Sequence, residues 1–377
     1  MKKRENYIFL RRYVRILTRG AMNIVNSLYL VKIFAGEIYN IYHKRNLYKD
    51  VDLSNQQKKS VQKLWHKNYG RKIPTKWHRL YQSYNGRFNK NYFPEIFVTM
   101  KLEPKLNDRE IGNIISDKSF FPMFYRDVEG VRLPDTYIMN NSGIYYTPDR
   151  KIIPYEDALK RLDNIGECVI KATLDTSSGD SISLCNFKNG LDVKSNRPVS
   201  EILASYKKDF IVQEKIVPHP ELEELYPGSV NTFRVITYLL EEKIEHSPIT
   251  LSMGRAGRRV DNIQAGGISV AVSDEGELYK EGFTHYKEVY KAHPDTGAVF
   301  EDYQLSKVKD IIKVTKKLHE KTPHMKIISW DVTLDENNDI VLLEFNVNGM
   351  TVWFPQMVSG KSVFGENTEK MIQMLKK

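Results

Sequence analysis

Short β-type segments separated by turns fill the sequence from about Glu167 onward, and this pattern restricts the fold more than any other feature. The segments are rich in β-branched and aromatic residues, and the separators carry the Gly, Asn and Asp residues of tight turns. The segments are CVIKATL, SISLCNF, FIVQEKI, TFRVITYLL, ISVAVS, ISWDVTL and IVLLEFNV. Helical patterns interrupt them at 198–207, 304–320 and 367–375. Antiparallel hairpins with intervening helices predict an α+β fold.

The basic charge of the chain is confined to its N-terminal part. The net charge is +10, but residues 1–110 hold 24 Lys or Arg against 8 Asp or Glu, and the remaining 33 Lys or Arg and 39 Asp or Glu give −6. Residues 2–45 also place apolar side chains at helical spacing, which predicts a basic helical arm. The arm either lies on an anionic membrane surface through residues 1–45 or packs on the next domain as an ordinary helix. Its longest charge-free stretch, 12 residues, is too short to span a bilayer.

Composition excludes several functional classes. The only two cysteines, Cys168 and Cys185, exclude a disulfide framework and a four-cysteine zinc site, and they favour a reducing compartment. We therefore expect a cytoplasmic protein, with peripheral membrane association through the arm. Residues 51–110 interleave lysine with Trp and Tyr, which can stack on bases, but aromatics at helical spacing more often form a core. Without a zinc spacing, an RNA-binding signature or a Walker sequence, we do not expect a nucleic-acid partner.

Two acidic residues stand in apolar β-type segments near the C-terminus. Strand alternation places Asp331 on the polar face of ISWDVTL, and it places Leu342, Glu344 and Asn346 on one face of IVLLEFNV. If residues 337–338 form a two-residue turn, Asp331 lies directly opposite Glu344. Carboxylates facing each other across a sheet repel, which predicts a cation between them, and Asn346 adds a neutral oxygen. Three oxygen ligands without His or Cys favour Mg²⁺, although an ordinary exposed pair of acids is the alternative.

Basic residues that can bind phosphate occur singly in other β-type segments. Lys171 lies in CVIKATL and precedes a turn of small residues whose amides and hydroxyls can close over phosphate oxygens. The candidate residues of this turn are Ser177, Ser178 and Gly179. Arg234 in TFRVITY offers a further anion contact, as do Arg255, Arg258 and Arg259. Any one of these residues is more often exposed or ion-paired, so their order along the chain is more informative than each alone.

That order resembles the layout of ATP-grasp enzymes over about residues 111–351, and the carboxylate–amine ligases among them are the most similar. ISDKSFFPMF is similar to the start of their ATP-binding module, which implies Lys118 as a first nucleotide lysine and Lys171 as a second. FIVQEKIV resembles the hinge beside adenine. The nucleotide contacts implied there are Gln213, Glu214, Lys215 and Ile216.

The remaining motifs extend the resemblance to the catalytic region. NTFRVITYL and RAGRRVDNIQAGG imply Arg234 and Arg255 as catalytic arginines and Asn262 as a nucleotide contact. ISWDVTL and LLEFNVNG imply the metal ligands Asp331, Glu344 and Asn346, the residues that strand geometry selects independently. The implied cofactors are ATP and two Mg²⁺ ions.

Within the superfamily the chain looks most like the sugar-transfer-associated branch of surface-polysaccharide and capsule biosynthesis. The single glycine of the phosphate loop and the absence of proline after Asn346 depart from the amino-acid ligases, so acceptor recognition is expected to differ. Residues placed to line the acceptor site are Arg258, Arg259, Asn348 and Trp353.

The resemblance implies a ligase that forms an amide through an acyl phosphate, attaching an amino acid or another amine to a sugar acid, free or lipid-linked. Two alternatives stay open: a kinase that phosphorylates a sugar or polyol hydroxyl, and a non-catalytic nucleotide-binding scaffold for glycosyltransferases. We expect four parts of the chain, a basic helical arm, a helical region, a lid subdomain and a metal-binding subdomain. Their expected limits are 1–50, 51–150, 151–216 and 217–377.

Overall fold

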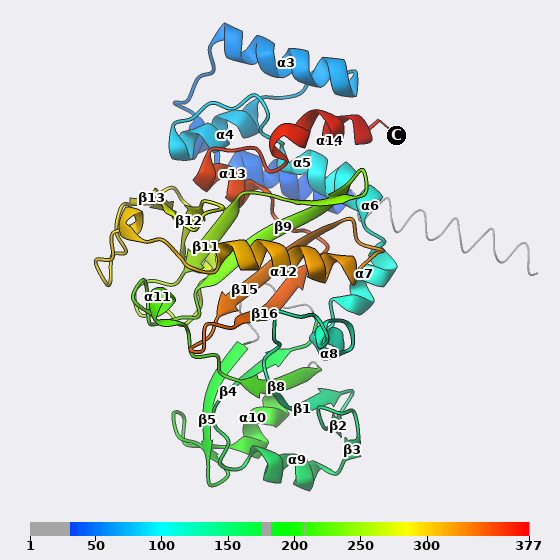
Figure 1. The fold of residues 1–377 in the computed structure, drawn as a ribbon, viewed down its shortest axis with the longest axis vertical. Coiled ribbons are helices and arrows are strands. Elements are labelled where there is room, and N and C mark those ends of the chain that lie inside the picture. The colour runs from blue at the N-terminus through cyan, green and yellow to red at the C-terminus, as the bar shows by residue number, and fades with distance from the viewer. Residues whose placement is uncertain (1–30, 175–181, 207–208, 377) are drawn as a thin grey trace, which may run out of the picture.

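The computed structural model describes residues 31–174, 182–206 and 209–376, and within them two antiparallel sheets stand one above the other (Figure 1). A group of helices from both ends of the chain lies beyond the second sheet. The α+β class and the helical N-terminal region predicted from the sequence are confirmed. In this part of the chain no helix is both long and apolar enough to cross a bilayer.

The first sheet takes its strands from between residues 136 and 214, with β8 and β4 near its centre. In spatial order the strands are β3 (Ile152–Ile153), β2 (Ile144–Tyr146), β1 (Thr136–Asn141), β8 (Phe210–Glu214), β4 (Gly166–Ala172), β5 (Ile182–Lys188), β6 (Leu191–Asp192) and β7 (Arg197–Pro198). Helices α9 (Tyr155–Leu162) and α10 (Val199–Ser205) bury Leu162 and Leu203 against Phe187 of this sheet. Because β1 pairs with β8, the boundary expected at residue 151 falls inside the sheet.

The second sheet has β9 near its centre and buries this strand on both faces. In spatial order its strands are β14 (Val289–Tyr290), β13 (Leu278–Phe283), β12 (Ile268–Val272), β11 (Ile249–Met253), β9 (Thr232–Leu240), β15 (Ile327–Leu334) and β16 (Ile340–Asn346), and β10 (Lys243–His246) pairs with β9. Phe233 and Val235 join the core beneath helix α12 (Val308–Glu320), whereas Ile236 and Tyr238 join a core on the opposite face. Burial on both faces explains why TFRVITYLL is almost continuously apolar.

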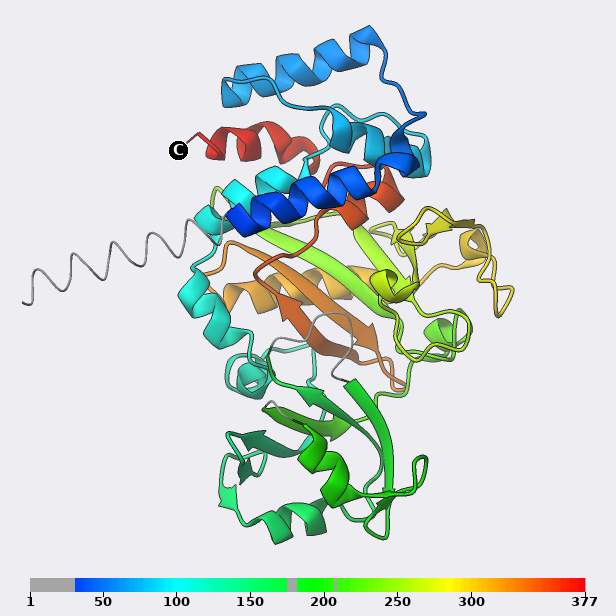
Figure 2. The same cartoon turned by 180° about the vertical axis from the view of Figure 1, so that it is seen from behind.

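Helices from the two ends of the chain cover that opposite face (Figure 2). The N-terminal ones are α3 (Asn55–Tyr69), α4 (Lys76–Asn85), α5 (Glu95–Phe97), the π-helical turn Val98–Leu102 and α6 (Glu103–Leu106); the C-terminal ones are α13 (Trp353–Ser359) and α14 (Thr368–Met374). Trp65 of α3 and Trp77 and Tyr81 of α4 are buried here. The aromatic residues that alternate with lysine are therefore core residues, as their helical spacing favours.

Residues 31–43 form a helix that is followed by α2 (Arg45–Tyr48), and both pack on the rest of the molecule. Ile41 and Tyr48 are buried in the same core as Trp77. The Lys44 ammonium lies 3.9 Å from the ring centroid of Trp353. This part of the arm packs on the next domain, which is one of the two alternatives expected. Residues 1–30, on which most of the membrane prediction falls, lie outside the described residues.

Short elements connect these layers. They are α7 (Arg109–Ile115), η2 (Lys118–Phe120), α8 (Phe121–Tyr125), α11 (Pro220–Glu223), η3 (Ile263–Ala265), η4 (Phe300–Asp302) and η5 (Gly365–Asn367). The first three lead from the helical layer to the first sheet, and η3 lies in the loop between β11 and β12. Lys118, the lysine implied to bind nucleotide, is therefore placed between the two sheets.

Two chain segments join the sheets, one before β1 and one after β8, and both cross at the turn end of the β15–β16 hairpin. On the first crossing the Arg132 N–H donates to the Ile340 carbonyl at 2.9 Å, and the Arg132 carbonyl accepts from Leu342 at 3.0 Å. On the second crossing the His219 N–H donates to the Leu334 carbonyl at 3.0 Å. The first sheet is thus attached along one edge of the second.

The Arg132 guanidinium binds both crossings to the hairpin. It forms an ion pair with Glu214 at the end of β8, and its Nε donates to Oδ2 of Asp335 at 2.6 Å. Burial opposes ionisation of Asp335, but hydrogen bonds from the Asp339 amide and from Arg132 outweigh burial and hold the pKa of Asp335 below its usual value. One guanidinium therefore forms ion pairs with two carboxylates at the junction of the sheets.

Replacing Arg132 with Met should destabilise this junction, because Glu214 and Asp335 lose their shared cation. We expect the free energy of unfolding at pH 7 to fall by about 2 kcal/mol, the scale of a hydrogen bond to a charged group. Folding lowers the pKa of Asp335, so this stabilisation is present above the unfolded pKa of about 4 and is lost as the pH falls through the folded pKa. Urea unfolding at pH 7 and pH 3 measures the difference. Arg71→Met, at an exposed arginine, is the control, and an unchanged urea midpoint for Arg132→Met at pH 7 would refute the assignment.

Candidate active site

The two predicted acidic ligands pair directly across the β15–β16 hairpin. Asp331 is the register partner of Glu344, and Asn346 lies two residues further along β16, opposite Ser329. The register predicted for Asp331 and Glu344 is thus confirmed. Asp331 is 9% exposed, so this end of the hairpin holds acidic groups within a largely apolar sheet.

The turn and the strand each differ from the prediction by one residue, and the two differences cancel. The turn has three residues, 336–338, instead of two. A β-bulge at Leu343 adds one residue to β16 and restores the pairing of Glu344. The bulge also turns Leu342 toward the apolar core, so the prediction that Leu342 shares a face with Glu344 is wrong.

Each carboxylate contacts a basic side chain of the protein. Arg234 on β9 donates from Nε and Nη2 to the two oxygens of Asp331, both at 2.8 Å. Burial disfavours the charge of Arg234, yet the attraction of Asp331 outweighs burial and raises the pKa of Arg234. The Lys118 ammonium donates to Oε1 of Glu344 at 3.1 Å. The repulsion expected between the two carboxylates is thus relieved by cations from two different elements.

Lys118 and Lys171 meet beside the bulge. The backbone N–H of Lys118 donates to the carbonyl of Thr173, just beyond β4, at 3.1 Å. Lys171, on β4 itself, places its ammonium 3.5 Å from the carbonyl oxygen of Leu343. Burial and the neighbouring charge of Lys118 lower the pKa of Lys171 to about 8, against the opposing effect of Glu344. A lysine with this pKa loses its charge just above neutral pH.

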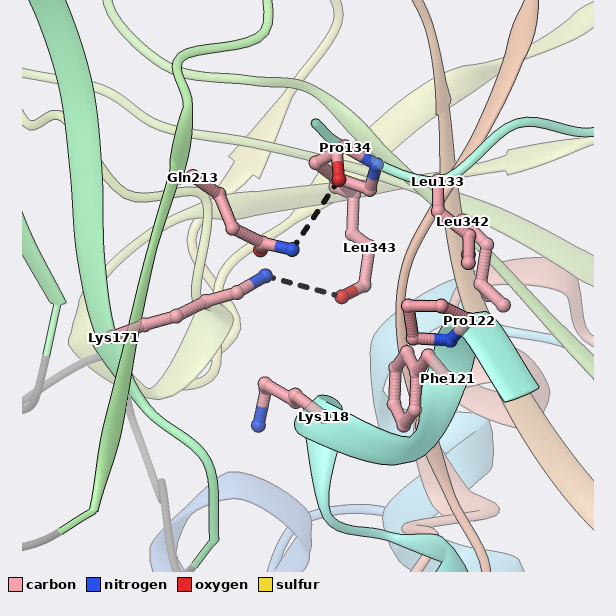
Figure 3. A pocket seen from close by; sticks show the side chains of 9 residues that line it. All are labelled: Lys118, Phe121, Pro122, Leu133, Pro134, Lys171, Gln213, Leu342 and Leu343. Atoms are coloured by element: carbon pink, nitrogen blue, oxygen red, sulfur yellow. Dashed lines mark hydrogen bonds between the residues drawn. The ribbon is translucent and has the colours of Figure 1, made fainter. Parts of the chain in front are cut away.

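A cavity lies between the two sheets at this point (Figure 3). The residues that line it are Lys118, Phe121, Pro122, Leu133, Pro134, Lys171, Gln213, Leu342 and Leu343. The first sheet contributes Lys171 and Gln213, and the bulged strand contributes the two leucines. The cavity therefore has both apolar walls and two ammonium groups. This combination suits a ligand with a flat apolar part and an anionic part.

Of the four hinge residues, Gln213 alone lines this cavity. Its Nε2 donates to Oγ1 of Thr136 at 3.0 Å, and its Oε1 is buried without a hydrogen-bond partner among the described residues. Glu214 is bound to Arg132, and Lys215 donates to Glu167 at 2.6 Å near the surface. Ile216 is buried. Among the four hinge residues, only Gln213 therefore has a side chain placed to contact a ligand in this cavity.

The loop between β11 and β12 holds Arg255 away from the paired carboxylates. The Arg255 guanidinium donates to the Gly266 carbonyl, the Tyr290 hydroxyl and Glu288, each at 2.6 Å. Asn262 accepts the amide of Gln264 at 2.7 Å and so caps η3. Arg258 binds the carbonyl of Ala265, and Arg259 is exposed. The structure thus brings together Lys118, Lys171, Arg234, Asp331 and Glu344, whereas Arg255 is hydrogen-bonded to its own loop and to residues at β14.

Sequence reasoning missed Asp261, whose carboxyl lies near the Arg234–Asp331 pair. Burial raises the pKa of Asp261 to about 6, and the charge of Asp331 adds to this, whereas a hydrogen bond from Thr232 and the charge of Arg234 oppose it. The signal in the sequence was an acid directly before Asn262 in RAGRRVDNIQAGG. Asp261 is therefore a third acidic group at this end of the second sheet.

The donor set of the hairpin fits a hard divalent cation. Two carboxylates and an amide share this end of β15 and β16, and the Oγ of Ser329 beside Asn346 is buried without a partner in the described residues. Within the described ranges no three His, Cys, Asp or Glu side chains cluster closely enough to hold a metal on their own. Such an ion would thus need oxygens from a ligand to complete its shell, as Mg²⁺ does with phosphates. Ser177, Ser178 and Gly179 lie outside the described residues.

Comparison with known proteins gives one family. A family model described as "Sugar-transfer associated ATP-grasp" matches residues 98–371. No curated protein matches the chain.

Several solved structures are similar in fold at low sequence identity. Biotin carboxylase from Campylobacter jejuni is 14% identical over 73% of this chain and 47% of its own, with a TM-score of 0.41. The D-Ala:D-Ser ligase from Enterococcus faecalis is 13% identical over 73% of this chain and 62% of its own, with a TM-score of 0.39. N5-carboxyaminoimidazole ribonucleotide synthetase from Thermotoga maritima is 11% identical over 79% of this chain and 61% of its own, with a TM-score of 0.38. The chain spans about half the length of the first structures it matches.

The pKa of Lys171 predicts how affinity for a phosphate ligand changes with pH. A bound phosphate favours the charged lysine, so affinity for Mg·ATP should weaken as the pH rises through about 8. Lys171→Met should weaken binding roughly tenfold to a hundredfold at pH 7 and flatten this dependence. Titration calorimetry with a non-hydrolysable ATP analogue from pH 6.5 to 9 measures both. Lys188→Met, at an exposed lysine of β5, should bind as the wild type does; equal losses in the two variants would contradict the assignment.

Proposed function

We propose that this chain, which belongs to the sugar-transfer associated ATP-grasp family, is an ATP-dependent ligase that joins a carboxylate to an amine. The observation that carries the proposal is the pair of carboxylates on β15 and β16. Lys118 and Arg234 contact them directly, beside a cavity that Lys171 also lines. Cations and carboxylates grouped in this way suit a magnesium–triphosphate ligand, which carries both signs of charge.

The nucleotide would bind between the two sheets, where the small cavity of about 10 Å³ marks one end of its site. Gln213 offers a buried carbonyl oxygen that has no partner among the described residues, and the amino group of adenine can donate to it. Lys118 and Lys171 would bind phosphate oxygens through charge-assisted hydrogen bonds. The small residues 177–179 that follow Lys171 in the sequence would add backbone amides.

Asp331, Glu344 and Asn346 would hold Mg²⁺, with two ions as the resemblance implies. Bound there, the metal supplies positive charge between the phosphates. Lys118, which donates to Glu344 in this structure, would donate to a phosphate oxygen instead in the loaded site. Arg234 would keep the Asp331 carboxylate oriented through its two hydrogen bonds.

The proposed reaction divides one difficult step into two. The substrate carboxylate first takes the γ-phosphoryl group as its bond to the ADP oxygen breaks. The amine nitrogen then attacks the acyl carbon, the carbon–oxygen bond to phosphate breaks, and the amine loses a proton. We assign stabilisation of the developing oxyanion to Arg234, because it lies beside the paired carboxylates and its bonds to Asp331 use only Nε and Nη2, whereas Arg255 is bonded within its own loop region.

For the acid substrate we propose a saccharide carboxylate, such as a uronic acid, because the family is associated with sugar transfer. A kinase acting on a sugar hydroxyl would use the same nucleotide site. The products separate the two: a ligase releases ADP and phosphate only when acid and amine are both supplied, whereas a kinase needs no amine and yields a phosphorylated sugar.

Removing both acidic ligands should abolish catalysis. Asp331→Asn combined with Glu344→Gln keeps side-chain volume but removes the charges that hold the metal, so ADP release should fall at least about a hundredfold. ADP release is measured with uronic acids and amino acids in combination, and circular dichroism checks that the fold is kept. Glu336→Gln, in the turn of the same hairpin, is the control and should be as active as the wild type. Normal ADP release by the double variant would exclude the proposed metal site, and AMP as the product would exclude the acyl-phosphate route.

A further inference from the structure

A second cavity of about 470 Å³ lies between the N-terminal helices and the loop that follows β16. The helix at 31–43, α4 and α5 form one side of it, and Gly349 and Thr351 of that loop form the other. Its lining is polar and aromatic, and includes Glu37, Lys44, Tyr81, Glu95 and Trp353. A cavity of this size accommodates a small metabolite such as an amino acid or a monosaccharide.

The wall of the cavity includes a residue close in sequence to the proposed catalytic hairpin. Gly349 in the wall lies three positions after the ligand candidate Asn346, a span of at most about 10 Å of extended chain. The wall also includes Gln264 of η3, whose amide is capped by Asn262. A substrate bound here would thus lie within reach of groups held at the end of β16.

The loop between these two places is held by buried glutamates. Oε1 and Oε2 of Glu103 each accept the Gly349 N–H at 2.9 Å, and Oε1 of Glu95 accepts the Val352 N–H at 3.2 Å. Glu95 is only 7% exposed, and its Oε2 is buried without a hydrogen-bond partner among the described residues. A buried carboxylate oxygen in a cavity wall calls for a donor, and a ligand is the group that can supply it.

The charges of the lining identify the kind of donor. Glu37 and Glu95 face the cavity with Lys44, so the ionised lining has an excess of one negative charge. Burial raises the pKa of Glu37 to about 7 and that of Glu95 well above its usual value, and it lowers the pKa of Lys44 to about 8, so a bound ammonium group would favour the ionised form of both acids. The Trp353 ring already carries one ammonium group, that of Lys44, 3.9 Å from its centroid. An ammonium group meets each of these demands, whereas a ligand whose only charged group is a carboxylate would add to the excess negative charge.

We propose that this cavity binds the amine substrate in its ammonium form, with Glu95 and Glu37 as its hydrogen-bond acceptors. The proposal rests on the ligase function proposed above and assigns the second substrate of that reaction to a site of its own. The shared chemistry is a primary ammonium on a small polar molecule, and both amino acids and amino sugars carry it. Lys44, beside the two acids, can pair with the carboxylate of an amino acid.

Direct binding tests the proposal without catalysis. Saturation-transfer NMR and calorimetry of the full chain are run with the common amino acids, glucosamine and galactosamine, each compared with its N-acetyl form, which cannot carry the charge. At least one free amine should bind, and its N-acetyl form should not. Amino acids that bind while amino sugars do not, or the reverse, identify the source of the amine. Equal binding of a free amine and its N-acetyl form, or a dissociation constant above about 10 mM for every amine, would overturn the proposal.

Variants locate the binding. Glu95→Gln keeps the oxygen that accepts the Val352 amide but removes the charge. Glu37→Gln removes the charge of the acid on the 31–43 helix. Each should weaken amine binding by about tenfold or more. Glu156→Gln, at an exposed acid of α9, should leave it unchanged. Unchanged affinity in both Glu95→Gln and Glu37→Gln would place the amine elsewhere.

Nucleotide binding separates this proposal from the ligase function. Glu95→Gln should bind Mg·ATP as the wild type does, and Asp331→Asn with Glu344→Gln should bind the amine as the wild type does. If the wild type binds the amine through Glu95 but no Mg·ATP, the ligase function fails while the amine site stands. If it binds Mg·ATP but no amine through Glu95, the amine site alone fails.

Discussion

Two carboxylates held opposite each other within an antiparallel sheet require cations, and the arrangement of the molecule follows from this requirement. A buried charge that loses its partner costs on the order of several kcal/mol. Asp331 takes its cation from β9, its neighbour in the second sheet. Glu344 takes its cation from Lys118, whose backbone is bonded just beyond β4 of the first sheet. The two ion pairs of one hairpin thus connect it to both sheets, next to the cavity between them.

The sequence was most informative where a local rule governs the outcome. Alternation along two strands and a tight turn between them predicted the pairing of Asp331 with Glu344, which the structure has because a longer turn and a bulge cancel each other. Alternation failed at Leu342, because a bulge adds a residue and no side-chain pattern in IVLLEFNV marks it. The hydrogen-bond partners of Arg255 could not be predicted from the sequence either. Its three hydrogen bonds depend on how the loop folds back on itself, which spacing along the chain does not reveal.

The N-terminal arm shows the same limit at larger scale. Its helical period was visible in the sequence, but the choice between a membrane surface and the rest of the chain as its partner depends on contacts distant in sequence. Ile41 packs with Trp77, and Lys44 stacks on Trp353, some three hundred residues away. The second cavity exists only because these distant segments meet. Neither Glu37 nor Glu95 has a local pattern that would distinguish it from an ordinary surface acid.

The backbone contacts of Glu95 have a consequence for how such a chain can evolve. The family match starts at residue 98, so Glu95 precedes the shared module while the loop that it holds lies inside it. Exchange of the whole N-terminal segment between relatives would remove the acceptor of the Val352 amide and one wall of the second cavity. Residues before and after this limit are therefore expected to diversify together, so that a change of substrate requires coordinated substitutions on both sides.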